Sequence, residues 1–83
     1  MTCRDEILEV ARTMVASRGV NDFTANDVVL EMARRRSRYP KTTIRTHVTS
    51  RMCRNAPSHH ALRFPDLERT SRGHYRLAPH HLE

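Results

Sequence analysis

The sequence contains no tryptophan, only two phenylalanines and two tyrosines, and only two glycines. Gly19 and Gly73 lie far apart in the chain, which excludes a glycine-rich loop of the kind that holds phosphates in nucleotide-dependent enzymes. Paired carboxylates next to a histidine on one predicted element are also missing. We therefore predict a protein that is not an enzyme and that uses no cofactor.

Long apolar runs are absent as well. No stretch approaches the roughly 18 consecutive apolar residues that cross a bilayer, and the N-terminus lacks the pattern of a secretory signal. We therefore expect a cytoplasmic protein with no membrane partner, in which Cys3 and Cys53 stay reduced. The six histidines lack the paired spacing of structural zinc sites, so we predict no metal site.

The chain has 83 residues, which is enough for one domain with one modest core. We expect this domain to span residues 1 to 78. Residues 79 to 83 are expected to form a C-terminal tail, of which the last two residues could be a cloning remnant.

Acidic side chains are scarce in the second half of the chain. Residues 1 to 33 hold three basic and six acidic side chains, whereas residues 34 to 76 hold twelve basic side chains against only Asp66 and Glu68. A one-sided basic surface attracts polyanions and releases condensed counterions when it binds them. The distribution of charge therefore favours a nucleic acid as the partner.

Helix-capping signals mark the start of two helices. Thr2 with Asp5, and Thr24 with Asp27, each have the spacing of a capping box, in which a hydroxyl and a carboxylate accept the first free N–H groups of a helix. Residues 23 to 24 could form a very short strand before the second helix. The first half of the chain is therefore predicted to be mainly helical.

A third helix is predicted after Pro40, which should also stop the second helix. Ile44, Val48 and Met52 recur at every fourth position and form a narrow apolar seam. This spacing predicts a helix over about residues 41 to 54 with one face in the core.

The segment after residue 66 has the pattern of a β-hairpin. A three-residue turn, Ser71-Arg72-Gly73, would place Leu67 opposite Leu77 and Arg69 opposite Tyr75. A two-residue turn would place the two leucines on opposite faces, so we predict the three-residue turn. Helices followed by this hairpin predict an α+β fold.

A resemblance to a known family rests on two stretches, TTIRTHVTSRMCRNAP at residues 42 to 57 and FPDLERTSRGHYRLA at residues 64 to 78. They resemble the winged helix-turn-helix domains of bacterial transcriptional regulators, and in particular an uncharacterised group that also occurs with restriction-type nucleases. The resemblance covers about residues 3 to 78. It implies a three-helix winged helix-turn-helix with a C-terminal β-hairpin wing.

The same resemblance implies a function. In such domains the third helix lies in the major groove of duplex DNA, and the wing, here residues 69 to 76, touches the backbone or the minor groove. We therefore expect double-stranded DNA as the partner, in transcription regulation or nuclease targeting. A second copy of the chain or a larger nuclease is a further expected partner.

The outward face of the predicted third helix carries side chains that suit DNA. In the major groove, arginine can pair with guanine, and threonine methyl groups can contact thymine methyl groups. The base-contact candidates are Thr42, Thr43, Arg45, Thr46 and Thr49. The phosphate or wing candidates are Arg34, Arg35, Arg36, Arg38, Lys41, Ser50, Arg51, Arg69, Arg72, His74 and Arg76.

Other interpretations of these residues stay open. The fold could serve as a protein–protein interaction or dimerisation module, because a fold does not fix its function. Structured RNA is a third candidate partner, disfavoured by the small number of aromatic side chains available for stacking on bases. The run of arginines after residue 33 could also be an ordinary solvated helix end.

Overall fold

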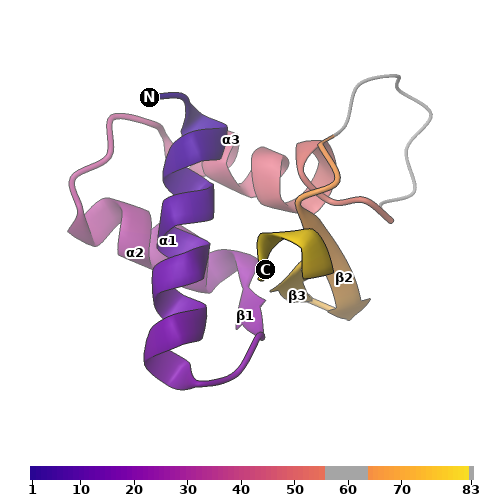
Figure 1. The fold of residues 1–83 in the computed structure, drawn as a ribbon. Helices are drawn as coiled ribbons and strands as arrows, with labels where there is room; N and C mark the ends of the chain where they lie inside the picture. Colours follow the sequence, from indigo (N-terminus) through magenta and orange to yellow (C-terminus); the bar gives the residue numbers. More distant parts are fainter. Residues whose placement is uncertain (56–63, 83) are drawn as a thin grey trace.

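The computed structural model describes residues 1 to 55 and 64 to 82. Its elements follow in the order α1 (Cys3–Arg18), β1 (Phe23–Thr24), α2 (Ala25–Arg34), α3 (Lys41–Thr46), a π-helical turn (His47–Arg51), β2 (Leu67–Ser71), β3 (His74–Leu77) and a 3-10 turn (Pro79–His81). Figure 1 shows α1 in front of α2 and α3, and the hairpin of β2 and β3 next to the end of α3. We call this hairpin the wing. The predicted α+β fold with a C-terminal hairpin wing is confirmed.

The strands form one antiparallel sheet in the order β1-β3-β2. The predicted two-residue strand is present as β1, which pairs with β3.

Within the described residues, no helix combines the length and apolar character that a membrane crossing requires.

Both predicted capping boxes are present. The Thr2 hydroxyl accepts a hydrogen bond from the N–H of Asp5, and the Asp5 carboxylate accepts one from the N–H of Thr2, each at 3.1 Å. Thr24 and Asp27 repeat the arrangement at 3.0 and 2.9 Å. Because each box satisfies N–H groups that a first helical turn leaves unpaired, α1 and α2 begin where the sequence predicts.

α2 does not end by the predicted mechanism. The N–H of Arg36 donates to the carbonyl of Ala33, and the N–H of Ser37 to that of Met32, both at 3.0 Å. These bonds form a Schellman motif, whose left-handed position is held by Arg36 with φ of 58°. The prediction that Pro40 stops α2 was wrong, because this motif has already closed the helix, and Pro40 instead precedes α3.

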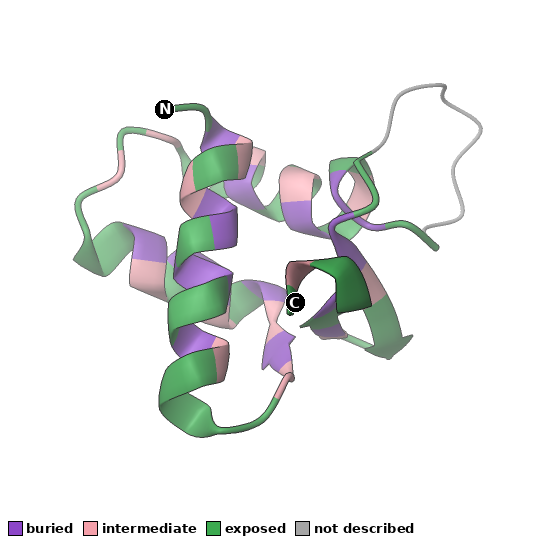
Figure 2. Cartoon of the chain, viewed as in Figure 1, coloured by how far each residue is buried: buried purple, intermediate pink, exposed green. Residues whose placement is uncertain are grey.

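The apolar seam of the third helix lies in the core, as predicted. Ile44, Val48 and Met52 are at most 2% exposed. They belong to one buried cluster together with Phe23 of β1 and Leu77 of β3. Figure 2 shows the buried residues on the inward sides of the helices and exposed residues on their outer sides. The seam therefore fixes which face of the third helix is turned to solvent.

The third helix is shorter than the predicted range of 41 to 54. The N–H of Met52 donates to the carbonyl of His47 at 2.8 Å, a bond over five residues that makes the last turn π-helical. The helix ends at Arg51. We use "third helix" below for α3 and this turn together, residues 41 to 51.

The chain leaves the third helix because its next backbone groups bond to β2. The N–H of Leu67 donates to the carbonyl of Met52, and the N–H of Arg54 donates to the carbonyl of Leu67, each at 2.8 Å. Cys53 and Leu67 thereby form a parallel bridge. The wing is joined directly to the end of the third helix.

The wing has the predicted pairing of Leu67 with Leu77, but its turn is tighter than predicted. Ser71 belongs to β2 and pairs with His74, so only residues 72 to 73 form the tip. A β-bulge in β2 takes up the extra residue and keeps both leucines on the buried face.

The segment expected to be a tail contacts the domain. Residues 79 to 81 form the 3-10 turn. The Nε2 atom of His81 lies 2.8 Å from Oδ1 of Asp66. This contact ties the segment after Ala78 to the rest of the chain.

The left-handed Arg36 gives a stability prediction. Arg36→Gly should raise the free energy of unfolding by about 1 kcal/mol, because glycine has no Cβ to oppose a positive φ. Urea unfolding followed by circular dichroism measures this change. Arg36→Ala is the matched control, since it removes the same side chain but keeps the Cβ. An alanine variant as stable as the glycine variant would contradict the explanation.

Candidate nucleic-acid interface

The exposed face of the third helix carries most of the predicted base-contact residues. Thr42, Arg45, Thr46 and Thr49 are exposed, whereas Thr43 is half-buried. Residues three or four apart lie on the same side of a helix, so the four exposed residues form one surface. Thr43 lies beside this surface, in a shallow depression lined by Thr42, Thr43, Thr46, His47 and Arg51.

Two of the hydroxyl groups on this face are bonded to the helix itself. Thr46 donates its hydroxyl proton to the carbonyl of Thr42 at 2.9 Å, and Thr49 donates to the carbonyl of Arg45 at 2.8 Å. The Nδ1 atom of His47 lies 2.9 Å from the carbonyl oxygen four residues earlier, which requires a proton on Nδ1. Oxygen lone pairs and methyl groups are left for contacts outside the helix.

Arg45 has a partner that the sequence did not reveal. One of its terminal nitrogens donates to the side-chain oxygen of Asn26 at 3.0 Å, in the first turn of α2. The other guanidinium N–H groups remain available, because arginine has five donors. Asn26 therefore positions Arg45 at the junction of α2 and the third helix, a role that depends on how the two helices cross.

Two of the predicted phosphate contacts are paired with carboxylates of α2 and α1. Arg34 and Arg35 bind the carboxylate of Glu31 at 2.6 and 3.1 Å. Hydrogen bonds from Arg34 and then from Arg35 lower the pKa of Glu31 to about 2. Arg35 also lies 3.7 Å from Glu9. These two arginines therefore add little net charge to the surface.

The turn between α2 and α3, together with the first residue of α3, carries basic side chains that are not paired with carboxylates of the described residues. Arg36, Arg38 and Lys41 are exposed and have no carboxylate partner within the described residues. Arg38 donates to the hydroxyl of Tyr39 at 3.0 Å, and its guanidinium lies 5.1 Å from the centre of that ring. Because Tyr39 also packs against the core, it anchors this basic turn.

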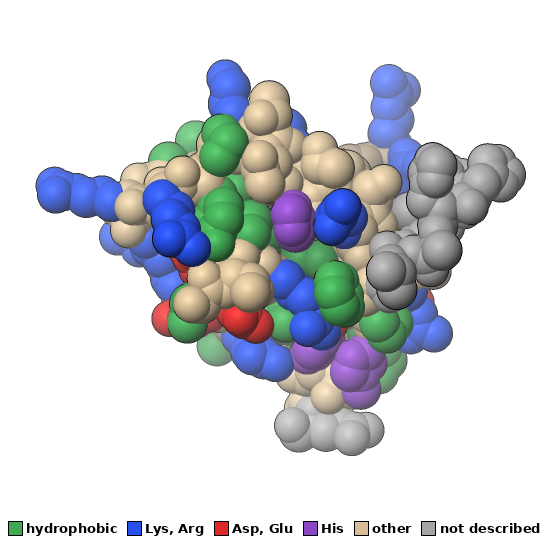
Figure 3. Space-filling view, turned by 90° about the horizontal axis from the view of Figure 1, so that it is seen from above, with side chains coloured by type: hydrophobic (Ala, Val, Ile, Leu, Met, Phe, Trp, Pro, Cys, Tyr) green, Lys and Arg blue, Asp and Glu red, His purple; other side chains and the backbone are tan. Residues whose placement is uncertain are grey.

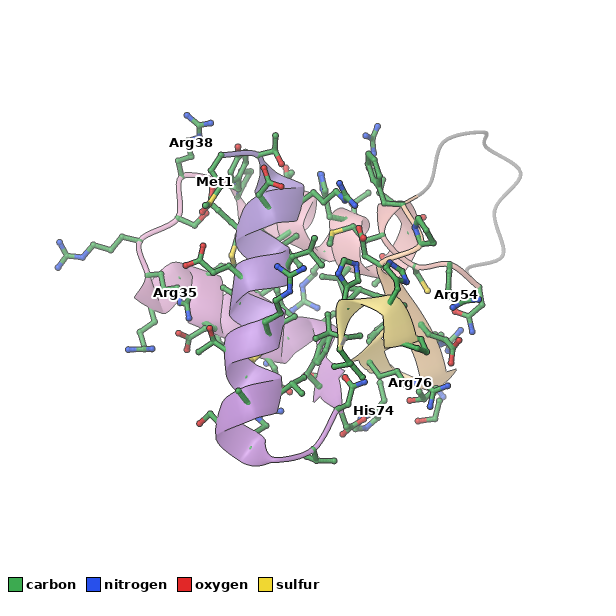
Figure 4. The ribbon with its side chains drawn as sticks, viewed as in Figure 1. Met1, Arg35, Arg38, Arg54, His74 and Arg76 are labelled. Carbon is green, nitrogen blue, oxygen red and sulfur yellow. The ribbon has the colours of Figure 1, made fainter. Side chains whose placement is uncertain are left out.

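Two basic residues of the wing also have acidic partners. Arg76 pairs across the hairpin with Glu68, to which Arg54 also comes within 3.9 Å. Figure 4 shows Arg54 and Arg76 at the wing side of the molecule, away from Arg35 and Arg38 on the other side. His74 lies 3.2 Å from Asp22. Arg76 and His74 are therefore engaged within the domain.

Four basic or polar candidates remain to be placed. Arg51, Arg69 and Arg72 are exposed, and no carboxylate among the described residues pairs with them. Ser50 is half-buried. Figure 3 shows Lys and Arg side chains projecting around the outline of one face, while the visible acidic side chains lie along its lower border. Apart from Arg12 of α1, which contacts His81, the lysine and arginine side chains that have no acidic partner among the described residues lie in the turn, the third helix and the wing.

Two asparagines fix the wing, and sequence reasoning missed both. The carboxamide of Asn55 accepts from the N–H of Arg69 and donates to its carbonyl, each at 2.9 Å. Asn21 does the same for Leu77, at 2.8 and 3.0 Å. The Asn55 amide bonds to the edge strand β2, whereas the Asn21 amide bonds to the central strand β3. Each asparagine follows a helix in the sequence, and this position does not identify the backbone to which its amide bonds.

A second polar cluster lies under the wing. Asp66 is fully buried, and its two carboxylate oxygens accept from the guanidinium of Arg4 at 2.7 and 2.9 Å. His81 lies 2.8 Å from the same carboxylate, and its Nδ1 lies 3.0 Å from a nitrogen of Arg12. Since arginine can only donate, the His81 Nδ1 accepts and its Nε2–H donates to Asp66.

This cluster also holds ligand atoms of Asp66, His80 and His81 within 4.8 Å of one another. A metal ion there would lie beside the guanidinium of Arg4, which already occupies both oxygens of Asp66. The donor set therefore fits an ion-pair cluster that joins α1 to the C-terminal segment better than it fits a metal centre.

The fold and the surface together define a small α+β domain with an attached wing and a basic helix-and-turn face. The chain belongs to the family described as a domain of unknown function, DUF7669, whose model matches residues 2 to 77. No curated protein and no solved structure matches the chain.

The buried Asp66 gives a prediction about pH. Burial opposes ionisation of Asp66, but hydrogen bonds from Arg4 and His81 outweigh it, so the pKa of Asp66 is lowered from its ordinary value. The stabilisation is present above that ordinary value, near 4, and is lost as the pH falls through the lower pKa of the folded state. Asp66→Asn should lower the free energy of unfolding by about 2 kcal/mol at pH 7.

Chemical denaturation at pH 7 and at pH 2.5 measures the effect, and the gap between wild type and Asp66→Asn should narrow at the lower pH. Asp22→Asn is the control, because the Asp22–His74 pair is half-exposed and should contribute little. Equal stability of wild type and Asp66→Asn at pH 7 would refute the importance of this cluster.

Proposed function

We propose that this domain binds duplex DNA, with the third helix in the major groove and the wing on the backbone or in the minor groove. The observation that carries the proposal is an exposed helix face of threonine and arginine, flanked by cations that have no acidic partner among the described residues. No acidic residue occurs between Glu31 and Asp66 in the sequence. A DNA phosphate backbone would therefore meet no negatively charged side chain along this segment.

The geometry of the third helix supports this proposal. The major groove is wide enough to admit one helix. Ile44, Val48 and Met52 hold the inner face in the core, so the opposite face is free to enter a groove. The basic turn before the helix, and Arg72 at the tip of the wing, would then contact phosphates on either side.

The alternative of a protein-binding surface on the third helix receives less support. Protein interfaces are usually centred on large apolar or aromatic side chains. The exposed large hydrophobic residues of the described chain are Met1, Val20, Leu30, Phe64 and Leu82. None of these lies on the third helix, so this face lacks the anchors that a protein partner would need.

A role in transcription regulation or in targeting a nuclease follows from the family resemblance and stays a prediction. So does the expectation that the domain acts together with a second copy or a larger partner. Both depend on duplex binding, which can be tested directly.

Removal of one interface arginine should weaken duplex binding. Arg72→Ala should lower the slope of log affinity against log salt concentration by about one, since one phosphate contact is lost. Arg45→Ala should reduce affinity by about 5- to 150-fold, because a base contact contributes roughly 1 to 3 kcal/mol. Fluorescence anisotropy with labelled random-sequence and selected duplexes, at two salt concentrations, measures both changes.

Arg18→Ala is the matched control for these variants. It removes the same charge from the end of α1, where Arg18 pairs with Asp27 at 3.2 Å. Its affinity for the duplexes should stay close to that of the wild type, and circular dichroism should show that all three variants fold. If the folded wild-type domain bound no duplex even at low salt, the proposed function would be abandoned.

A further inference from the structure

The hydrogen bonds inside the third helix determine what its outer face can offer to a base. A hydroxyl has one proton to donate and two lone pairs to accept with. Thr46 and Thr49 each give that proton to a helix carbonyl, at 2.9 and 2.8 Å. Both residues are exposed, so they present acceptor lone pairs and methyl groups to the outside, but no donor.

His47 between them has the same property when its ring is neutral. Its Nδ1 proton is used by the helix carbonyl 2.9 Å away, which leaves Nε2 as an acceptor. Donors on this face come instead from the hydroxyl of Thr42 and from the charged side chains of Arg45 and Arg51. Around Thr46 and Thr49, the face therefore offers methyl groups and acceptors.

The base pairs of DNA differ in how they match such a surface. In the major groove an A·T pair presents the amino donor of adenine, two acceptors and the 5-methyl group of thymine. A G·C pair presents two acceptors on guanine and the amino donor of cytosine, but no methyl group. The lone pairs of Thr46 and Thr49 could accept from either amino group, so they do not separate the two pairs. Only an A·T pair offers a methyl group to the exposed threonine methyl groups.

Resting on the proposed DNA binding, we infer that Thr46 and Thr49 select A·T base pairs through contact with thymine 5-methyl groups. Arg45, held at one margin by Asn26, then serves a neighbouring guanine or a phosphate. Base choice in this domain would depend on methyl contact at the centre of the helix, while charged side chains around it would supply affinity.

Substitution of uracil for thymine tests this inference, because it removes only the methyl group and keeps base pairing and charge. A selection from random duplexes should enrich A·T pairs within the bound site. The selected duplex should then lose about fourfold in affinity for each contacted thymine that is replaced by uracil, as expected for one methyl group taken out of contact.

Two variants at Thr49 assign the effect to its methyl group. Thr49→Ser keeps the hydroxyl and removes the methyl group, so it should lose the discrimination between thymine and uracil at one position. Thr49→Val keeps methyl groups and removes the hydroxyl, so it should retain the discrimination. Thr13→Ser is the control, because the exposed Thr13 bonds to the carbonyl of Glu9 at 2.9 Å in the same way but lies on α1.

The outcomes separate this inference from the function on which it rests. Duplex binding with equal affinity for the thymine and uracil forms, or enrichment of G·C pairs opposite Thr46 and Thr49, would overturn the inference and leave DNA binding in place. The absence of any duplex binding would overturn both.

Discussion

Two backbone hydrogen bonds join Leu67 to the residues that directly follow the third helix, and they fix the position of the wing relative to that helix. They tie the first residue of the wing to Met52 and Arg54, directly after the helix. The side chain of Asn55 extends the connection to Arg69. Because Met52 is itself buried in the core, the third helix and the wing share one anchor. A ligand that touches both would meet a surface that is already arranged, so little ordering would be needed on binding.

Acidic side chains decide which of the many arginines are available to a partner. Glu31 binds Arg34 and Arg35, and Glu68 binds Arg76 and approaches Arg54. A count of positive charge along the sequence therefore overstates the charge of the surface. The basic side chains that no carboxylate of the described residues pairs with lie mainly on the turn before the third helix, on that helix and at the tip of the wing. The basic residues without acidic partners therefore lie on connected parts of the fold, which the order of basic residues along the sequence does not reveal.

The features that could be predicted from the sequence are those set by neighbours in the chain or by strict periodicity. The capping boxes at Thr2 and Thr24, the seam through Ile44 and the pairing of Leu67 with Leu77 belong to this kind. The left-handed Arg36, the π-helical turn and the bonds of Asn26 depend on how distant elements meet, and no local pattern reports them. For the candidate interface, the sequence pattern predicted which side of the third helix is exposed, except at the half-buried Thr43. It could not tell a paired arginine from one without an acidic partner.

The proposed binding of duplex DNA across both the third helix and the wing can be tested by titrating the ¹⁵N-labelled domain with a short duplex and recording two-dimensional NMR spectra of the backbone amides. We expect the largest shifts within residues 36 to 51 and 69 to 73, while the exposed side of α1 and α2 around Leu30 stays unchanged. Shifts centred on Leu30, or on the third helix without the wing, would contradict it.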